Sequence, residues 1–300
     1  MYNYFMRKII VNKKYAGKKL NTFLLDNFNG LTINTIYKTL RKKDIRINNI
    51  KISENCTVNE GDEITIYLTD DLLFKTIKLD ILYEDNNILV ANKPAGIEVV
   101  SNDKNEITLT KLVLDNFSSF YFPAPCHRLD RNTCGLVVFA KNKESLEILL
   151  DKFKNMEIDK HYKCTVYGIP KTKQTTLTAY LFKDSKKSLV YISDEPKKGY
   201  QKIVTSYNVI SENKEDNTSI LDVTLHTGRT HQIRAHMSFI GHPVVNDSKY
   251  ELKKYSDITP PTKYRGYYLT ATSFTFNCGG MLSYLDGKSF TVTPSWDKGF

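Results

Sequence analysis

The spacing of apolar residues changes near residue 70 and divides the chain into two parts. Before this point, apolar residues recur at helical spacing over 20–28 and 33–40, and short strand-like stretches then flank an Asn48-Asn49 turn. From Leu79 onward, stretches typical of buried strands mix with a few helical ones without strict alternation. A chain of 300 residues commonly holds two domains. The sequence therefore predicts a small α/β domain over residues 1–70 and a larger α+β domain with a mixed sheet over residues 71–300.

Positive charge is concentrated in the first fifty residues. Between Arg7 and Lys51 there are twelve lysines and arginines against two acids, an excess as large as the net charge of +10 of the whole chain. Residues 52–70 hold five acids and no base. A solvated lysine-rich surface is one interpretation, but this segregation favours a surface for a polyanion, above all nucleic acid. The candidate RNA-binding cations end the second helical stretch: Lys38, Arg41, Lys42 and Lys43.

The layout of this first part resembles the small RNA-binding domain named after ribosomal protein S-four. The matching segments are KKLNTFL from Lys18, INTIYKTLRKKDIRINNIKI from Ile33 and VNEGDEITIYL from Val58. Lys19-Leu20-Asn21 stands where that family usually has Arg-Leu-Asp, and Asn34-Thr35 stands where its second helix begins near Ser-Arg. The resemblance implies that residues 1–70 bind RNA.

The composition is typical of a cytoplasmic protein. Hydrophobic residues make up 41% and charged residues 25% of the chain, and no apolar run approaches the roughly 20 residues of a membrane-spanning helix. The N-terminus, MYNYFMRKII, lacks the order of features of a secretory signal. The five cysteines lie far apart without a Cys-x-x-Cys pair, so neither a disulfide framework nor a thiolate zinc site is expected. We expect a cytoplasmic monomer that does not bind a membrane.

The sequence contains no complete motif for a nucleotide phosphate or a metal. Gly287-Lys288-Ser289 resembles the end of a phosphate-binding loop, but Leu282 stands where that loop requires glycine. Four histidines are spaced by five and six residues, which does not bring them to one face of a helix or strand. They are His226, His231, His236 and His242. We expect no metal here, and we expect these histidines to form hydrogen bonds or contact RNA.

Two polar segments beside apolar ones carry the candidate chemistry. In residues 126–141, a run of polar side chains that includes Asp130 precedes a buried strand. In residues 225–237, a strand end and a turn lead into a helix with an apolar stripe, and Arg234 lies next to that stripe. A buried arginine needs a carboxylate partner, for which Asp130 is the obvious candidate. A purely structural Arg–Asp pair in a loop is the alternative interpretation.

Together these segments resemble the pseudouridine synthases of the RluA type. The family signature His-Arg-Leu-Asp-x-x-Thr-Ser-Gly-Leu stands here as residues 127–136, with Cys134 in place of serine. The motif Gly-Arg-Thr-His-Gln-Ile-Arg-x-His is intact over 228–236. Two further family elements are Asn-Lys-Pro-x-Gly at 92–96 and Lys-x-Tyr at 160–162, and a third, His-Pro-x-x-Gly-Asp-x-x-Tyr-Gly, is reduced to His242-Pro243, Asn246-Asp247 and Tyr250-Glu251. The resemblance covers about residues 79–300 and implies a mainly antiparallel sheet in the catalytic domain.

The resemblance also implies an isomerase that needs no cofactor. Members of the family break the bond between the sugar and the uracil nitrogen of a uridine in RNA, rotate the base and join its carbon 5 to the sugar, without redox change or group transfer. Asp130 is implied as the catalytic carboxylate, and Arg234 would keep it charged in a desolvated pocket. Tyr162 would stack on the uracil and take part in moving the proton on carbon 5. Whether Asp130 attacks the sugar, attacks the base or removes a proton stays open at this point.

Contacts with the RNA follow from the same resemblance. The target base must leave its stack to reach the pocket. Arg128 would fill the place that the base leaves, and Arg229, near the start of the helix, would contact a phosphate. Lys93 and Pro94 are expected to support Tyr162, and Lys93 counts among the candidate substrate-binding residues.

Several functions remain open on the sequence alone. Family members with this N-terminal domain often act on large-subunit ribosomal RNA, which favours that target over transfer RNA. A catalytically silent RNA-binding or ribosome-assembly factor on the same fold is less favoured, because Asp130, Tyr162 and Arg234 are all present. A hydrolase that uses two carboxylates is also less favoured, because the motif holds no second acid beside Asp130.

Overall fold

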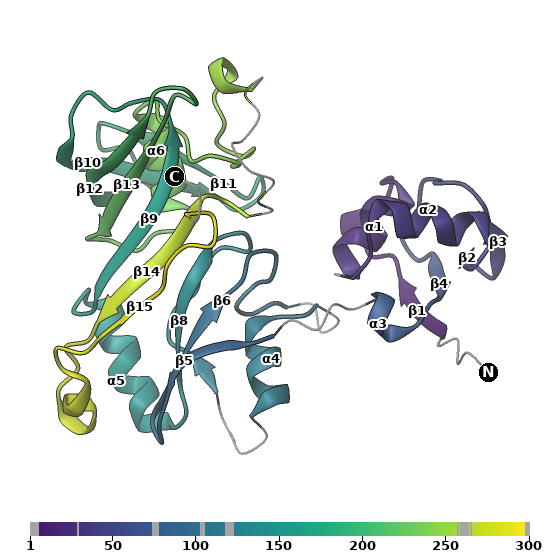
Figure 1. Cartoon of the computed structure of the whole chain (residues 1–300), viewed down its shortest axis with the longest axis horizontal. Helices are drawn as coiled ribbons and strands as arrows, with labels where there is room; N and C mark the ends of the chain where they lie inside the picture. The colour runs from purple at the N-terminus through teal and green to yellow at the C-terminus, as the bar shows by residue number, and fades with distance from the viewer. Residues whose placement is uncertain are drawn as a thin grey trace. The chain divides into compact units, whose positions relative to one another are not determined.

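The chain folds into two units, shown in the computed structural model of Figure 1. The described residues are 6–28, 30–73, 78–102, 106–117, 123–256, 258, 264 and 266–297. The first unit comprises Met1–Lys78 with Asp103–Glu106, and the second comprises Leu79–Asn102 with Ile107–Phe300. The first unit runs past the expected boundary at residue 70 because Leu73, in the one-turn helix α3 (Asp70–Leu73), is buried in its core.

The described part of the first unit contains a four-stranded antiparallel sheet, in the order β1-β4-β2-β3, and short helices. The elements besides α3 are β1 (Met6–Ile10), η1 (Lys13–Tyr15), α1 (Leu20–Asn27), α2 (Ile33–Arg41), β2 (Ile45–Ile47), β3 (Ile50–Ile52) and β4 (Glu63–Tyr67). Thr32 caps α2 by accepting a hydrogen bond from the backbone N–H of Thr35. Ile36, Thr39 and Leu40 of α2 are buried, while Lys38 and Arg41 lie on its exposed face.

In the described part of the second unit, the strands form a single 11-stranded sheet. The main path is β11-β10-β12-β13-β9-β14-β8-β6-β5, while β15 pairs with β14 and β7 with β8. All these pairings are antiparallel except that of β14 with β8, which confirms the predicted mixed, mainly antiparallel α+β fold. The strands are β5 (Asp80–Glu84), β6 (Ile88–Lys93), β7 (Ala124–Pro125), β8 (Cys134–Ala140), β9 (Asp159–Tyr167), β10 (Gln174–Asp184), β11 (Leu189–Ser193), β12 (Gln201–Asn213), β13 (Thr218–Leu225), β14 (Leu269–Thr275) and β15 (Ser289–Thr291).

Helices cover parts of this sheet (Figure 1). They are α4 (Leu109–Asn116), α5 (Lys143–Lys154), α6 (Gln232–Phe239), η2 (Lys253–Tyr255) and η3 (Gly280–Leu285). The helix α6 packs on β10, β11 and β12, where Ala235 shares a buried cluster with Leu181, Val190 and Ile203. No helix in the described ranges is long and apolar enough to cross a membrane.

Three neighbouring strands bring the sequence motifs together. Ala271 of β14 pairs with Gly135 of β8 on one side and with Tyr162 of β9 on the other. Gly135 has a φ of 109°, and a Cβ atom there would lie 2.2 Å from the carbonyl oxygen of Ala271. Only glycine therefore allows the two backbones to approach so closely. The loop that carries Asp130 ends directly before β8, so this register brings the loop near Tyr162.

Candidate active site

Asp130 and Arg234 form the ion pair that the sequence predicts. Nη1 of Arg234 donates a hydrogen bond to Oδ2 of Asp130 over 2.8 Å. The Arg234 side chain is only 2% exposed because α6 is buried over most of its length, whereas the Asp130 side chain is 27% exposed. The pair therefore has a cation inside the protein and a carboxylate at the edge of a pocket.

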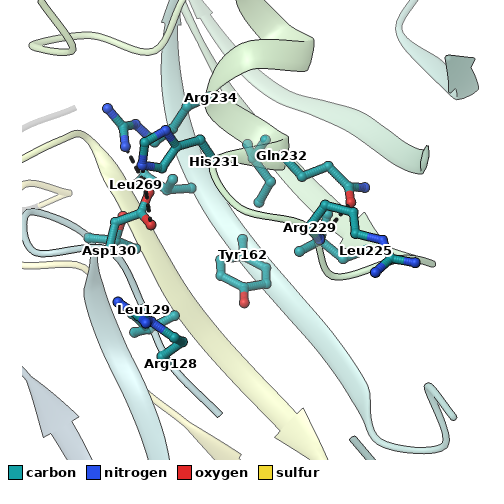
Figure 2. Close-up of a pocket in the computed structure, with 12 residues that line it drawn as sticks. Arg128, Leu129, Asp130, Tyr162, Leu225, Arg229, His231, Gln232, Arg234 and Leu269 are labelled. Atoms are coloured by element: carbon teal, nitrogen blue, oxygen red, sulfur yellow. Dashed lines mark hydrogen bonds and ion pairs between the residues drawn. The ribbon is translucent and has the colours of Figure 1, made fainter. Parts of the chain in front are cut away.

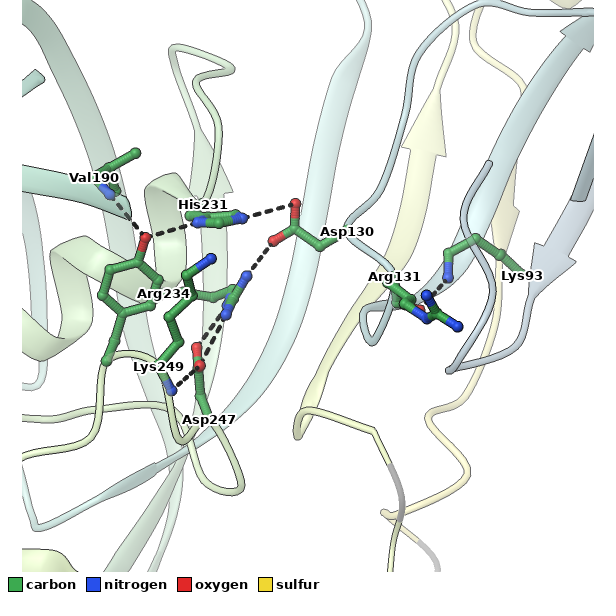
Figure 3. A network of polar contacts seen from close by, with 9 residues as sticks. Lys93, Asp130, Arg131, Val190, His231, Arg234, Asp247 and Lys249 are labelled. Atoms are coloured by element: carbon green, nitrogen blue, oxygen red, sulfur yellow. Dashed lines mark hydrogen bonds and ion pairs between the residues drawn. The ribbon is translucent and has the colours of Figure 1, made fainter. Parts of the chain in front are cut away.

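The main partner of Arg234 is a second carboxylate, which the sequence interpretation missed (Figure 3). Nε and Nη2 of Arg234 donate to the two oxygens of Asp247 over 2.6 and 2.8 Å, and the Asp247 side chain is fully buried. Burial by itself would lower the pKa of Arg234, but the hydrogen bonds and charge of Asp247, and then the charge of Asp130, raise it. The guanidinium also lies over the Tyr267 ring, with Cζ 4.0 Å from the ring centre. Arg234 is thus charged and fixed in one orientation.

Asn246 shows how the chain accommodates a departure from the family pattern. It stands where the family has glycine, and it adopts a left-handed φ of 65°, which asparagine tolerates better than most residues. Its side-chain amide donates to the carbonyls of Tyr264 and Gly266 over 2.8 and 2.7 Å. The turn that carries Asp247 is therefore held in place without the glycine.

Tyr162 lines the same pocket as Asp130 and Arg234 (Figure 2). Its side chain comes from β9 and is 8% exposed. Burial, and then the negative charge of Asp130, raises the pKa of Tyr162, so the phenol is protonated at neutral pH. Leu129, Leu225 and Leu269 complete an apolar wall next to the charged pair. The three residues predicted to be catalytic therefore meet in one pocket.

Lys93 is not placed as the sequence interpretation expects for a substrate-binding residue. It is fully buried, and its ammonium group donates to the carbonyls of Pro94, Ile97 and Arg131 over 2.9, 2.8 and 3.0 Å. Burial lowers its pKa to about 8. An ammonium group with three donors, all used by carbonyls, has none left for RNA. Lys93 instead ties the end of β6 to the loop that contains Asp130.

Arg128 and Arg229 are exposed and line the pocket, as expected for residues that contact the substrate. Arg229 lies three residues before α6 rather than at its first turn, and its backbone N–H donates to the side chain of Gln232. Both arginines also border an adjoining cavity of about 460 Å³, whose lining includes Lys183 and Lys249. This cavity therefore has a strongly cationic lining on one side of Asp130.

The remaining candidate cations belong to the first unit. Lys38 and Arg41 lie on α2, Lys42 caps its C-terminus and Lys43 follows with a left-handed φ of 60°. All four side chains are exposed. They form the surface that we call the α2 basic face.

The four clustered histidines have different partners rather than a common one. His226 bonds to Ser206, His236 to Thr205 and His242 to the backbone carbonyl of Tyr167. His231 lies between Tyr250 and Asp130. In the described ranges, no group of three or more histidine, cysteine or acidic side chains is arranged to hold a metal ion.

Comparisons with known proteins agree with this geometry. The family model described as RNA pseudouridylate synthase matches residues 87–239, which include Asp130, Tyr162 and Arg234. An RNA pseudouridine synthase of Mycoplasma capricolum, named as uncharacterised, is 31% identical over 97% of this chain and 99% of its own. The ribosomal large subunit pseudouridine synthase C of Buchnera aphidicola subsp. Baizongia pistaciae is 32% identical over 81% of this chain and 80% of its own.

A solved structure shares the fold. The human RNA pseudouridylate synthase domain containing 1 matches with a TM-score of 0.56 and 24% identity, over 74% of this chain and 92% of that one. The family model covers half of the chain, and relatives above 30% identity cover most of it. The chain therefore belongs to the RNA pseudouridine synthases, the isomerases that convert uridine in RNA to pseudouridine.

Proposed function

We propose that this enzyme isomerises uridine in large-subunit ribosomal RNA and that Asp130 is its catalytic carboxylate. The observation that carries the proposal is a partly exposed carboxylate, held by a buried arginine, in a pocket that Tyr162 also lines. The reaction breaks one bond to the sugar and forms another, so a charged carboxylate acting on the nucleotide is the group it requires. The relatives named ribosomal large subunit pseudouridine synthase C support ribosomal RNA rather than transfer RNA as the target.

In this proposal Arg234 holds Asp130 in position and balances its negative charge. A carboxylate that acts as a nucleophile or a base must be oriented toward the nucleotide, and the guanidinium fixes Oδ2 of Asp130 through a hydrogen bond of 2.8 Å. Because Asp247 binds the other edge of the guanidinium, Arg234 cannot turn away when RNA enters the pocket. Asp247 thus supports Asp130 through Arg234.

Tyr162 receives the extruded uracil in the same proposal. Extruding a base from structured RNA costs a few kcal/mol, which stacking on an aromatic ring and filling of the vacated place can offset. The ring of Tyr162 offers the stacking surface, and the exposed Arg128 at the edge of the pocket fills the place in the RNA. Because its pKa is raised, the phenol of Tyr162 stays protonated, which supports a role as a stacking surface and hydrogen-bond donor rather than as a ready base.

The first unit acts as an accessory RNA-binding domain in this proposal. Support comes from the α2 basic face, since four exposed cations lie within six consecutive positions, and from its resemblance to the S-four type of domain. Arg229, Lys183 and Lys249 around the cationic cavity would contact phosphates of the same RNA.

Maps of pseudouridine in total RNA test the proposed function. We compare cells with the gene intact, deleted, or carrying Asp130→Asn, which removes the charge but keeps the shape of the side chain. One or more sites in large-subunit ribosomal RNA are expected to lose pseudouridine completely in both altered strains. Loss of pseudouridine at transfer RNA sites instead would identify transfer RNA as the target. Identical maps in all three strains would argue for a catalytically silent RNA-binding factor.

Removing the α2 basic face is expected to weaken RNA binding in a salt-dependent way. The triple variant Lys38/Arg41/Lys42→Ala should bind ribosomal RNA less tightly, and the slope of log affinity against log salt should fall by about one for each phosphate that these cations neutralise. The control variant removes three exposed lysines of the second unit: Lys154, Lys171 and Lys214. The same affinity and slope as the control would show that this face does not contact RNA.

A further inference from the structure

His231 has an unusual backbone at the start of α6. It is the residue that precedes the helix, but its side chain makes no capping hydrogen bond and its φ of 53° is left-handed. Residues other than glycine adopt this conformation at an energetic cost, and such strain clusters at functional sites. The imidazole of His231 lies instead between the side chains of Tyr250 and Asp130. Figure 3 shows it directed toward Asp130.

The contacts of Tyr250 favour one of the two neutral tautomers of His231. The backbone N–H of Val190, in β11, donates to the Tyr250 hydroxyl oxygen over 3.1 Å. The same oxygen is 2.7 Å from Nδ1 of His231. A bare Nδ1 accepts the hydroxyl proton, whereas an Nδ1–H would leave that proton without an acceptor among the described residues, so the favoured arrangement points the hydroxyl proton to Nδ1. A neutral imidazole has one N–H group, which must then be at Nε2. His231 therefore directs an N–H group toward Asp130.

The two oxygens of Asp130 are held differently. Oδ2 accepts the charge-assisted hydrogen bond from Arg234. Oδ1 lies 3.8 Å from Nε2 of His231, which is too long for a hydrogen bond but within reach of the attraction between an N–H dipole and a charge. Within the described residues, Oδ1 accepts no hydrogen bond, so its lone pairs are available to a substrate.

The surroundings of His231 keep its ring neutral near pH 7. Burial lowers its pKa to about 4, against the opposing attraction of Asp130, and the positive charge of Arg234 lowers it further. The charged groups that face His231 come from the loop before β8, from α6 and from the segment after α6: Asp130, Arg234, Asp247 and Lys249. A neutral ring fixed by Tyr250 is a directional donor rather than a second cation.

We propose that His231 is a positioning residue of the isomerisation, whose Nε2–H, oriented by Tyr250, aims Oδ1 of Asp130 at the target nucleotide. The inference rests on the proposed role of Asp130 as the catalytic carboxylate. Arg234 donates a hydrogen bond to only one oxygen of Asp130, so the carboxylate can still rotate about its Cβ–Cγ bond. His231 restrains that rotation by attracting Oδ1, and because no hydrogen bond forms at 3.8 Å, the lone pairs of Oδ1 remain available to the substrate. Loss of His231 therefore slows the chemical step and leaves RNA binding unchanged.

Asparagine and glutamine provide a matched pair of substitutions at position 231. Asparagine accepts the left-handed backbone, and its amide reaches about as far as Nδ1, so it can meet Tyr250 but not Asp130. The amide nitrogen of glutamine reaches about as far as Nε2 and can again face Asp130 as a donor. His231→Asn thus removes the proposed interaction, and His231→Gln restores part of it.

Single-turnover reactions separate the chemical step from binding. The enzyme is in excess over total RNA from cells that lack the gene, and pseudouridine is measured at the sites that the native enzyme modifies. We expect His231→Asn to lower the maximal rate constant by about tenfold to a hundredfold, with an unchanged enzyme concentration at half-maximal rate, and His231→Gln to recover part of the loss. A rate constant for His231→Asn equal to that of the native enzyme overturns the inference, and so does an equal loss in both variants.

Nitrogen NMR of histidine-labelled full-length protein tests the same inference without RNA. In the native protein we expect His231 to have its proton on Nε2 and a bare Nδ1. Tyr250→Phe removes the hydroxyl and should shift the ring toward a mixture of both tautomers. A proton on Nδ1 in the native protein overturns the inference, even where a variant at position 231 fails to fold. By contrast, a native enzyme that forms no pseudouridine in any of these RNAs contradicts the proposed function, while the NMR result still decides the tautomer.

Discussion

Arg234→Met is expected to destabilise the second unit by about 3–5 kcal/mol and to abolish pseudouridine formation. The substitution leaves the fully buried carboxylate of Asp247 without a counter-ion, and an unpaired buried charge is costly. It also removes the only hydrogen-bond donor that the described residues supply to the carboxylate of Asp130. Stability and activity are thus lost for two separable reasons.

The double variant Arg234→Met/Asp247→Asn separates these two effects. Asparagine is neutral and can still accept the backbone N–H of Lys249, so most of the lost stability should return. Activity should not return, because Asp130 still lacks its cation. Recovery of both would show that Arg234 contributes only to folding, and recovery of neither would show that Asp247 has another essential role.

The single tryptophan makes this stability measurement specific to one unit. Trp296 is the only tryptophan in the chain, it is buried in the second unit, and its indole donates to Thr270 of β14 over 3.1 Å. Urea unfolding followed by tryptophan fluorescence therefore reports on the second unit, whereas a signal from the whole backbone would mix two separately packed units.

The sequence predicted the Asp130–Arg234 pair because each residue sits beside a strong local signal. Arg234 adjoins the apolar stripe of a helix, and a buried guanidinium requires a carboxylate. Asp247 was not recognised as a partner because it lies in an irregular turn, where apolar periodicity carries no information. The left-handed backbone of His231 could not be predicted either, because histidine has no strong preference for that conformation.

The fold was predictable at the level of class but not of topology. A continuous apolar run over 88–91 correctly indicated β6, and apolar alternation over 162–166 and 221–225 correctly indicated β9 and β13. The strands β10 and β12, which carry many polar and exposed residues, gave no clear alternation, and their pairing is decided by contacts between distant segments. The strand register that places the site likewise depends on long-range contacts. It pairs Ala271 with Gly135 and with Tyr162, and Gly135 permits this close pairing but does not specify it.

Mild acid is expected to destabilise the second unit steeply between about pH 6.5 and pH 4. Burial lowers the pKa of His127 to about 3 and the pKa values of His231 and His236 to about 4, whereas an unfolded histidine titrates near pH 6.5. In this window the unfolded chain binds protons that the folded chain does not, so the free energy of unfolding decreases as the pH falls. Each histidine contributes up to about 1.4 kcal/mol per pH unit.

His127→Gln tests the largest of these contributions. Nε2 of His127 accepts a hydrogen bond from the backbone N–H of Val138 over 3.2 Å, which a protonated ring could not do. The side-chain oxygen of glutamine can accept the same bond and stays uncharged at every pH. Urea unfolding at several pH values, read from Trp296, should show a slope with pH that is shallower by about 1.4 kcal/mol per unit in the variant. An unchanged slope would mean that His127 already shares its proton with solvent in the folded state, and that the acid sensitivity of this unit has a different origin.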